Sequence, residues 1–342
     1  MPGQPGFFDV QDRYEALSRA GDPLEGLRTM IPWESFRKHL KKTLQRKENG
    51  LGGRPPFDDV LMFKVLVLQA LYNLSDDQTE YQIRDRLSFM RFLGLDMDGT
   101  VPDAKTIWLF RERLARAGAV EKLFARFDRH LEEHGLMANG GQIIDASIIP
   151  VPKQRNDRDE NDAIKAGETP KEWKKEPAKL RQKDVDARWA VKNKQNYYGY
   201  KNHVNTDKTH KLIRRYHVTD ASVHDSSAFD EVFDKKNTAK DTWADAAYRA
   251  KAREEELKAR GYRSRIHYKG TRGHPLSEAK QATNTRRSRV RARVEHVFGR
   301  QAQMGGKLVR CIGIVRARAN IGLKNLAYNL QRFVFLAKPA PA

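Results

Sequence analysis

Three carboxylates in this sequence occupy positions where an acidic side chain is unexpected. Asp145 interrupts the apolar segment GQIIDASIIP (141–150), which otherwise has the composition of a short strand. Asp245 follows the apolar pair Trp243–Ala244, where another strand is expected to end. Glu295 is the only acidic residue among the last 64, which also contain fourteen Lys and Arg. A buried ionised carboxylate costs several kcal/mol unless something pairs with it, so these positions call for a cation or for exposure.

Acting together, these three carboxylates favour metal-assisted chemistry on phosphodiesters. Two strand-end aspartates and one helical glutamate can bind two divalent cations, and hard oxygen ligands with open positions suit Mg²⁺. Two such ions activate a water or hydroxyl and stabilise the leaving oxygen.

Each carboxylate also has an ordinary structural interpretation. Asp145 can cap a strand end or pair with an arginine, and Asp245 can cap the helix that follows it. Glu295 lies four residues after Arg291, so a helical ion pair worth a few tenths of a kcal/mol is available.

Composition points to a polyanionic partner. The 342 residues suggest two domains, or one large domain with insertions, and the formal net charge is +21. Such a surplus favours nucleic acid first and an anionic membrane surface second. The single cysteine, Cys311, excludes an intrachain disulfide, the N-terminus lacks a signal-peptide pattern, and the apolar window 60–74 is too short to span a bilayer. We expect a soluble cytoplasmic protein that binds nucleic acid.

The N-terminal third is expected to be helical. A helix is predicted over 33–47, and the Gly- and Pro-rich GLGGRPP (50–56) predicts a linker or turn. Three further helices are predicted, within 60–71, from Ser75 and from about Pro102. The last of them is basic, with Lys105, Arg111, Arg113 and Arg116. This block is either a helix-turn-helix DNA reader or an ordinary helical bundle with solvated charges.

From residue 141 the hydrophobic period changes to that of strands. The polar run 153–194 is predicted to be a long loop, partly disordered without a partner. The other predicted elements are strands over 143–151, 197–207, 210–219 and 262–268, a short strand within 241–250 that leads into a helix ending near Arg260, a helix over 226–236 and a mostly helical segment over 286–336. This order is typical of a mixed α/β sheet.

Several of these segments resemble the DDE transposases of bacterial insertion sequences, in particular the family founded on insertion sequence five. They are IIDASIIPVP (143–152), YGYKNHVNTD, HKLIRRYHVTDASVHDSSAF, WADAAY, RARVEHVFGR and IGLKNLAYNLQRF, together with the N-terminal stretch that begins GRPPFDDVLMFK. The resemblance implies an RNase H-like catalytic domain over 136–342, with a polar insertion at about 153–194. It also implies a preceding α-helical DNA-binding domain over 1–135.

The resemblance assigns the catalytic and metal-binding roles to Asp145, Asp245 and Glu295. It implies two Mg²⁺ ions, with Mn²⁺ able to substitute, and metal-dependent strand cleavage at the element ends followed by strand transfer into target DNA. The implied partners are the terminal inverted repeats, the target DNA and at least one further copy of the chain. The implied location is the bacterial cytoplasm, on the nucleoid. The residues expected to contact DNA are Arg289, Arg291, Arg293, Arg300, Lys307, Lys105, Arg111 and Arg113.

The last motif departs from the family pattern of Tyr, Arg, Glu and Lys. Ser288 occupies the Tyr position and Ala302 the Lys position, for which Lys307 is a candidate substitute. Tyr248, three residues after Asp245, is present. Three other residues, His203, His224 and Asp225, also match family positions, where such histidines are more often structural or phosphate-facing than metal ligands.

Two alternative functions remain open from the sequence. One is a nuclease on the same fold that cuts DNA without strand transfer. The other is a non-catalytic DNA-binding regulator derived from a transposase, against which the intact set of three carboxylates argues.

Overall fold

The computed structural model describes residues 9–44, 55–192, 194–306 and 308–338. The chain forms two compact units. One comprises Met1–Arg126 with Leu330–Ala342, and the other comprises Phe127–Asn329. No helix among the described residues is both long and apolar enough to cross a membrane.

The first unit is helical. Its elements are α1 (Asp9–Arg19), α2 (Glu25–Met30), the 3₁₀ turn η1 (Trp33–Phe36), α3 (Arg37–Leu44), α4 (Asp59–Tyr72), α5 (Asp76–Asp85), α6 (Leu87–Leu93) and α7 (Ala104–Arg116). The unit also contains the start of α8 (Ala119–Glu133) and the end of α16 (Ile314–Ala337). The helix expected over 33–47 therefore begins as a 3₁₀ turn, and its last residues lie outside the described part of the chain. Most of the expected linker 50–56 also lies outside it.

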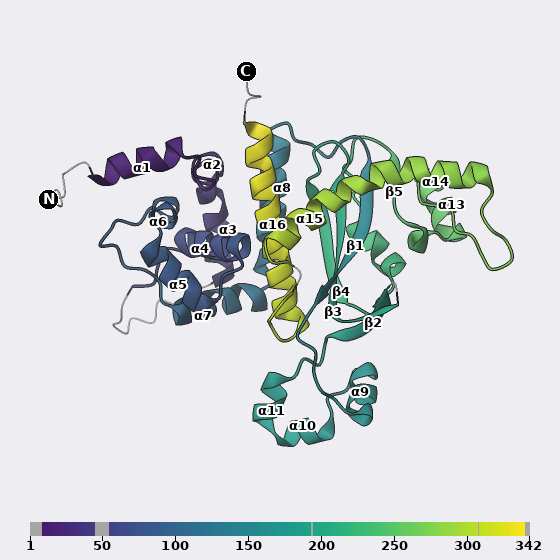
Figure 1. Cartoon of the computed structure of the whole chain (residues 1–342), viewed down its shortest axis with the longest axis horizontal. Coiled ribbons are helices and arrows are strands. Elements are labelled where there is room, and N and C mark those ends of the chain that lie inside the picture. The colour runs from purple at the N-terminus through teal and green to yellow at the C-terminus, as the bar shows by residue number, and fades with distance from the viewer. Residues whose placement is uncertain (1–8, 45–54, 193, 307, 339–342) are drawn as a thin grey trace. The chain divides into compact units, whose positions relative to one another are not determined.

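Side-chain caps explain where the helices of this unit begin. The Asp58 carboxylate accepts hydrogen bonds from the first turn of α4, and Asp103 does the same for α7. Ser75 forms a reciprocal capping box with Gln78 at the start of α5. The apolar helix α4 is buried on nearly all sides among its neighbours (Figure 1), which accounts for its continuous hydrophobic sequence.

The second unit is built on a six-stranded mixed sheet. The strands are β1 (Gln142–Pro150), β2 (Arg188–Lys192), β3 (Gln195–Asp207), β4 (Ile213–Asp220), β5 (Asp241–Trp243) and β6 (Arg263–Ser264), in the order β2-β3-β1-β5-β6, with β4 also paired to β3. β1 runs antiparallel to β3 and parallel to β5. The mixed α/β sheet inferred from the sequence is confirmed, although the strand expected over 262–268 is reduced to the two residues of β6.

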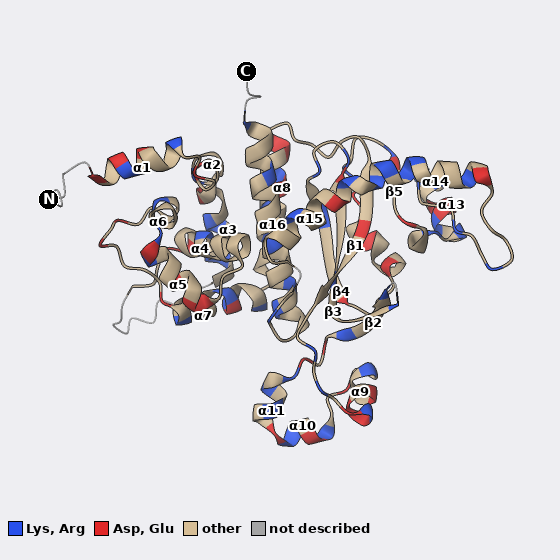
Figure 2. Ribbon diagram, in the orientation of Figure 1, with Lys and Arg blue, Asp and Glu red and all other residues tan. Residues whose placement is uncertain are grey.

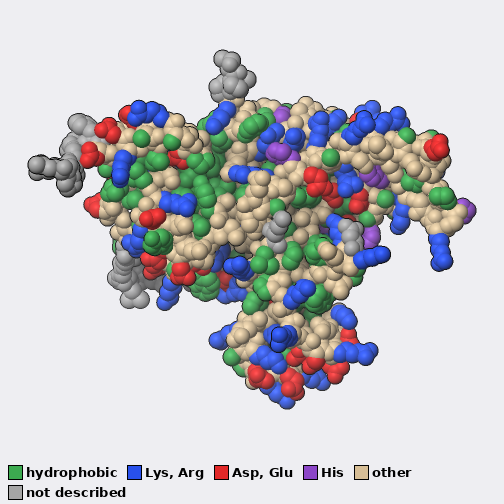
Figure 3. Space-filling model, in the orientation of Figure 1, with side chains coloured by type: hydrophobic (Ala, Val, Ile, Leu, Met, Phe, Trp, Pro, Cys, Tyr) green, Lys and Arg blue, Asp and Glu red, His purple; other side chains and the backbone are tan. Residues whose placement is uncertain are grey.

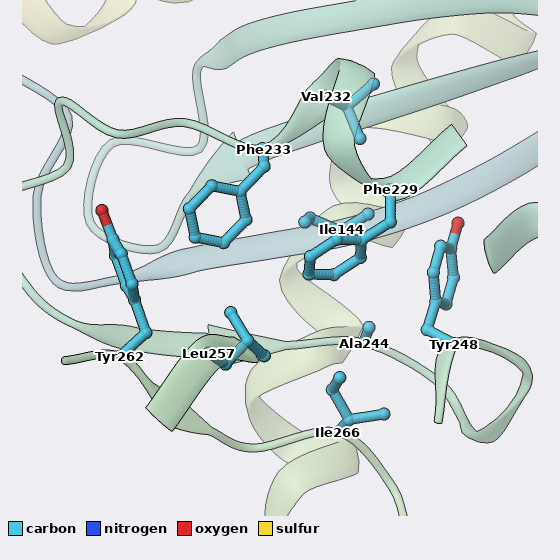
Figure 4. Close-up of a cluster of buried hydrophobic side chains, with 9 residues drawn as sticks. All are labelled: Ile144, Phe229, Val232, Phe233, Ala244, Tyr248, Leu257, Tyr262 and Ile266. Atoms are coloured by element: carbon cyan, nitrogen blue, oxygen red, sulfur yellow. The ribbon is translucent and has the colours of Figure 1, made fainter. Parts of the chain in front are cut away.

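Side chains on opposite faces of the sheet enter two different cores. Ile144 packs with residues of the helices α12 (Phe229–Val232) and α13 (Lys251–Ala259) (Figure 4). Ile149 packs with residues of the long helix α16 (Ile314–Ala337). Because successive strand residues point to opposite faces, Asp145 lies on the same face as Ile149. Asp145 is therefore on the side of the sheet that α16 covers.

The polar run 153–194 is not the long loop that its composition predicts. It contains α9 (Arg158–Lys165), α10 (Lys171–Lys175), α11 (Pro177–Gln182) and the strand β2. The Trp173 side chain is fully buried there and its indole N–H donates to the Glu160 carboxylate at 2.6 Å. One aromatic anchor thus organises a segment whose surface carries interspersed charges of both signs (Figure 3), which is why composition alone misled the prediction.

The remaining helical expectations are confirmed with changed boundaries. The helix expected over 226–236 consists of a 3₁₀ turn, η2 (Asp225–Ala228), followed by α12. A 3₁₀ turn, η3 (Ala246–Tyr248), follows β5. After a loop, the C-terminal helical segment begins earlier than expected with α14 (Glu278–Arg291) and continues through η4 (Ala292–Val294) and α15 (Glu295–Gln303) to α16.

Candidate active site

The pairing of the parallel strands β1 and β5 brings Asp145, within β1, level with Asp245, which follows the end of β5. Ile143 of β1 pairs with Trp243 of β5, and each aspartate lies two residues beyond this pair. Asp245 is thus at the carboxyl end of a parallel strand, which is a common location for functional groups. Although 100 residues separate the two aspartates in the sequence, the register places them side by side.

Asp145 is a buried carboxylate that is only partly compensated. Its exposed fraction is 7%, and burial raises its pKa to about 6. The Arg291 guanidinium, with Nε 3.2 Å from the carboxylate, and the backbone N–H of Ala146, at 2.9 Å, lower this pKa, whereas the charge of Asp245 raises it. The ion pair with an arginine that the sequence allowed is therefore present. Its effect on the pKa of Asp145 is smaller than that of burial.

Asp245 serves as an N-cap. Its Oδ1 accepts a hydrogen bond from the backbone N–H of Ala247 at 2.8 Å, at the start of η3. The structural role that the sequence allowed for Asp245 is thus confirmed. The same hydrogen bond fixes the carboxylate at the end of β5, next to Asp145.

Glu295 begins α15, one helical turn after Arg291. Both residues and the intervening turn have right-handed helical backbone angles. Glu295 is exposed, and Arg291 pairs with Asp145 rather than with Glu295. In the described ranges, no three His, Cys, Asp or Glu side chains are grouped so that they could hold a metal ion. The structure therefore juxtaposes the two aspartates and leaves the glutamate outside a formed three-ligand cluster.

Tyr248 adds a buried hydroxyl to this region. Its side chain is 1% exposed, and within the described structure its Oη has no hydrogen-bond partner. Burial raises its pKa well above the usual value, and the charges of Asp145, Asp225 and Asp245 act in the same direction. The hydroxyl consequently stays protonated and lies in the field of three carboxylates.

Asp225 and Lys201 form an ion pair in the same region. Lys201 Nζ lies 2.8 Å from Asp225 Oδ1 and donates to the Val223 carbonyl at 2.6 Å. The sequence had identified Asp225 only by position, and it offered no signal for Lys201, because a lone lysine in a strand usually faces solvent.

The histidines near the site differ in environment. His203 is fully buried, its Nε2 lies 2.9 Å from the Thr219 hydroxyl, and burial lowers its pKa to about 4. It pairs in register with Ala146 and so points to the face opposite Asp145. His224 caps η2 through its contact with Ser226. Ser288, at the position of the family tyrosine, lies 3.4 Å from the ring of His267.

The basic residues expected to contact DNA differ in the contacts that they already make within the protein. Arg289, Arg293 and Arg300 are exposed along α14, η4 and α15, where Lys and Arg are numerous (Figure 2). The Arg293 guanidinium donates to the Lys208 carbonyl at 2.8 Å, and that of Arg300 donates to Gln303. Lys307 lies outside the described residues.

The basic residues of α7 divide in the same way. Lys105 and Arg113 are exposed, and Trp108 and Leu109 are exposed on the same helix at 45% and 40%. Arg111 instead forms a bidentate ion pair with Asp76 and also donates to Gln69. The exposed tryptophan could not be recognised from the sequence, because its position in the helical period does not distinguish a surface residue from a core residue.

Comparison with protein families identifies both parts of the chain. Residues 12–113 match the family described as Transposase domain (DUF772). Residues 138–330, more than half of the chain, match the family described as Transposase DDE domain. The chain belongs to the DDE transposase family. The enzyme class and activity expected from the sequence are thereby confirmed.

Among solved structures, this transposase is similar to the piggyBac transposase in its synaptic complex with hairpin DNA, determined by cryo-electron microscopy. The similarity has a TM-score of 0.43 at 12% sequence identity and covers 91% of this chain and 73% of the other.

Proposed function

We propose that this transposase, of the insertion sequence five family, cleaves DNA at the ends of its element and joins the released ends to target DNA. The observation that carries the proposal is the register of β1 and β5, which places Asp145, within β1, beside Asp245, just beyond the end of β5. In an RNase H-like domain, this is where two acidic residues bind the ions used for phosphoryl transfer. The third acidic ligand in the proposal is Glu295.

The two adjacent aspartates fit divalent metal ions. Asp145 and Asp245 would hold them, with Glu295 completing the set, because carboxylate oxygens are the ligands that Mg²⁺ prefers. The pKa of about 6 at Asp145 reflects a buried charge that lacks sufficient cationic compensation, which a bound ion would supply. Two Mg²⁺ ions, replaceable by Mn²⁺, would supply activation of a water or hydroxyl and stabilisation of the leaving oxygen.

The protein's own contribution in this proposal is binding and positioning. Arg291 neutralises part of the charge at Asp145 from 3.2 Å, and Tyr248 keeps a protonated hydroxyl among the carboxylates. The exposed arginines Arg289, Arg293 and Arg300 would contact the DNA backbone, as would Lys307.

We propose that the helical region within 1–135 supplies most of the sequence recognition. On α7, Lys105 and Arg113 are available for DNA, while Arg111 holds the helix in place through Asp76. The exposed Trp108 and Leu109 can add apolar contacts to base edges. Because two element ends must be cut together, the functional assembly would be a dimer or larger, acting on the nucleoid.

Three substitutions test the site. Asp145→Asn, Asp245→Asn and Glu295→Gln each keep the size of the side chain and remove the charge that binds metal. Each should abolish cleavage of an end-containing duplex in Mg²⁺ and leave duplex binding within about twofold. A variant that cleaves at the wild-type rate would remove its residue from the proposal.

The products distinguish this function from its alternatives. Strand transfer of a pre-cleaved end into a plasmid identifies a transposase that completes the reaction. Cleavage without transfer would instead identify a nuclease, and binding without either product would identify a regulator. A matched control is Asp241→Asn, at the start of β5, where the carboxylate pairs with Arg263 and Arg265 rather than with the site.

A further inference from the structure

A chain of buried amide side chains connects α15 to the central sheet. Gln301, on α15, donates from Nε2 to Oδ1 of Asn325 on α16 at 2.6 Å. Gln301 is 6% exposed and Asn325 is fully buried. The helix that begins with Glu295 is therefore attached to α16 by a hydrogen bond inside the core.

Asn325 continues this connection to β3. Its Oδ1 also accepts from Asn202 Nδ2 at 2.9 Å, and its Nδ2 donates back to Asn202 Oδ1 at 3.1 Å. Asn202 is 1% exposed and pairs in register with Ser147 of β1, two residues from Asp145. Residues two apart on a strand share a face, so the amide chain ends on the face of the sheet that carries Asp145.

Other polar contacts fix the same helices in the same register. Asn329 of α16 forms hydrogen bonds to both the N–H and the carbonyl of Ile213, at 3.0 and 2.7 Å. Lys324, also on α16 and 6% exposed, donates to the carbonyl of Met304 at the end of α15, at 2.7 Å. The C-terminal end of α15 is thus attached to α16 at two points, Gln301 and Met304. In turn, α16 is attached to β3 and β4.

In the observed register, the buried amide groups of Gln301, Asn325 and Asn202 are hydrogen-bonded to one another. The Asn325 side-chain oxygen accepts two hydrogen bonds, one from Gln301 and one from Asn202, and its amide nitrogen donates one to Asn202. Sliding α15 along α16 by one residue would leave several buried polar groups without partners, which is strongly unfavourable in a low-dielectric interior. An apolar helix interface of the same area would tolerate such a shift more easily.

We propose that Gln301, Asn325 and Asn202 are positioning residues that set the distance between the Glu295 carboxylate and Asp145. Through these hydrogen bonds, the position of α15 relative to β3, and so to the neighbouring strand β1, is fixed by way of α16. Glu295 is exposed at the start of α15, so its location depends on the register of the whole helix. The inference rests on the proposed role of Glu295 as a metal ligand.

The test compares Gln301→Met with Gln303→Met in the full-length protein. Methionine keeps the length of the side chain and removes the amide donor. Gln303 is two residues further along α15 and exposed, so it serves as the matched control. Mn²⁺ binding to the DNA-free protein, measured by electron paramagnetic resonance, should weaken about tenfold in Gln301→Met and remain unchanged in Gln303→Met. Hydrogen exchange in α15 should rise only in Gln301→Met.

A second pair of variants separates positioning from simple loss of stability. Asn325→Asp keeps the acceptor that Gln301 uses, whereas Asn325→Leu removes it. Mn²⁺ affinity should therefore fall more in Asn325→Leu than in Asn325→Asp. A lower melting temperature with unchanged Mn²⁺ affinity in both Gln301→Met and Asn325→Leu would overturn the proposal.

Glu295→Gln distinguishes failure of this inference from failure of the proposed function. If Glu295→Gln weakens Mn²⁺ binding and Gln301→Met does not, the amide chain has no positioning role. If Glu295→Gln itself leaves Mn²⁺ binding unchanged, Glu295 is not a ligand and the proposed site is wrong. In the double variant, the Gln301→Met effect should largely disappear, because positioning cannot matter once the carboxylate is gone.

Discussion

At the scale of single residues, the site is defined by a conflict between burial and charge. Asp145 is almost fully buried in a strand, and one arginine is not enough to restore the ordinary acidity of its carboxyl group. Groups held in such unfavourable environments are concentrated at functional sites, because the ligand relieves the cost that the folded protein bears. In the proposed site, the apolar neighbours of Asp145 therefore favour the binding of a metal ion at its carboxylate.

This conflict predicts that Asp145→Asn stabilises the metal-free protein in a pH-dependent way. The wild-type carboxyl has a pKa of about 6 when folded and about 3.8 when unfolded, so the unfolded state loses its proton first as the pH rises. Wild-type stability should therefore fall between pH 4 and pH 6, by up to about 3 kcal/mol. Urea unfolding in EDTA should show the Asp145→Asn variant and the wild type equal at pH 4 and the variant more stable at pH 8.

The control for this experiment has the opposite sign. The Arg265 and Arg263 guanidinium groups lower the pKa of Asp241, so its ionised form contributes stability above pH 4 that is lost as the pH falls. Asp241→Asn should therefore be less stable than wild type at pH 8. If Asp145→Asn also proved less stable at pH 8, Asp145 would be an ordinary structural ion-pair partner of Arg291.

At the scale of elements, two glycines differ in whether the fold has room for a side chain at their positions. Gly199, in β3, has φ +153°, and a Cβ there would lie 2.3 Å from the Ile149 carbonyl oxygen and 2.9 Å from the Val151 nitrogen. Both atoms are backbone, so they cannot move aside without disturbing β1. Gly299, in α15, has no such neighbour within 4 Å.

These environments predict opposite effects of the same substitution. Gly199→Ala should destabilise the protein by on the order of 3 kcal/mol, because strain and a backbone clash add together. Gly299→Ala should stabilise it by about 0.5 to 1 kcal/mol, since alanine restricts the unfolded chain and favours helix. Chemical denaturation of the two variants measures both values. A stable Gly199→Ala protein would mean that β3 can move away from β1.

At the scale of the whole molecule, the formal charge of +21 is the dominant feature. The second unit presents exposed arginines from α14 to α15, and the first presents basic residues on α7. Charge of this magnitude predicts duplex binding that depends strongly on salt, because each phosphate that a basic side chain neutralises releases counterions.

The salt dependence can be assigned to particular arginines. Replacing Arg289, Arg293 and Arg300 together by Ala should reduce the slope of log affinity against log salt concentration by about 0.9 for each phosphate that the protein no longer neutralises. Titrations of labelled duplex at several salt concentrations measure this slope. The control is Arg263→Ala with Arg265→Ala, since both guanidinium groups pair with Asp241. An unchanged slope accompanied by a lower melting temperature would show that the three arginines serve the fold alone.

By itself, the sequence determined the class of protein and the identity of its acidic candidates. Asp145 stood out because an acid inside an apolar strand is unfavourable, and the last 64 residues stood out because they retain one acid among fourteen bases. The helix starts expected at Ser75 and near Pro102 agree with the observed caps Ser75 and Asp103, because helix starts depend on interactions within a few residues. These features could be predicted because each depends on residues that are close together in the sequence.

Only the tertiary structure decided how the distant parts meet. The register that places Asp145 beside Asp245 depends on strand pairing across 100 residues, for which neither segment carries a local signal. The core around Trp173 was hidden in a segment of polar composition, because a single buried aromatic can organise many exposed charges. The amide chain from Gln301 to Asn202 was equally invisible, since an asparagine in a helix or strand is usually exposed and becomes informative only when its partners are known.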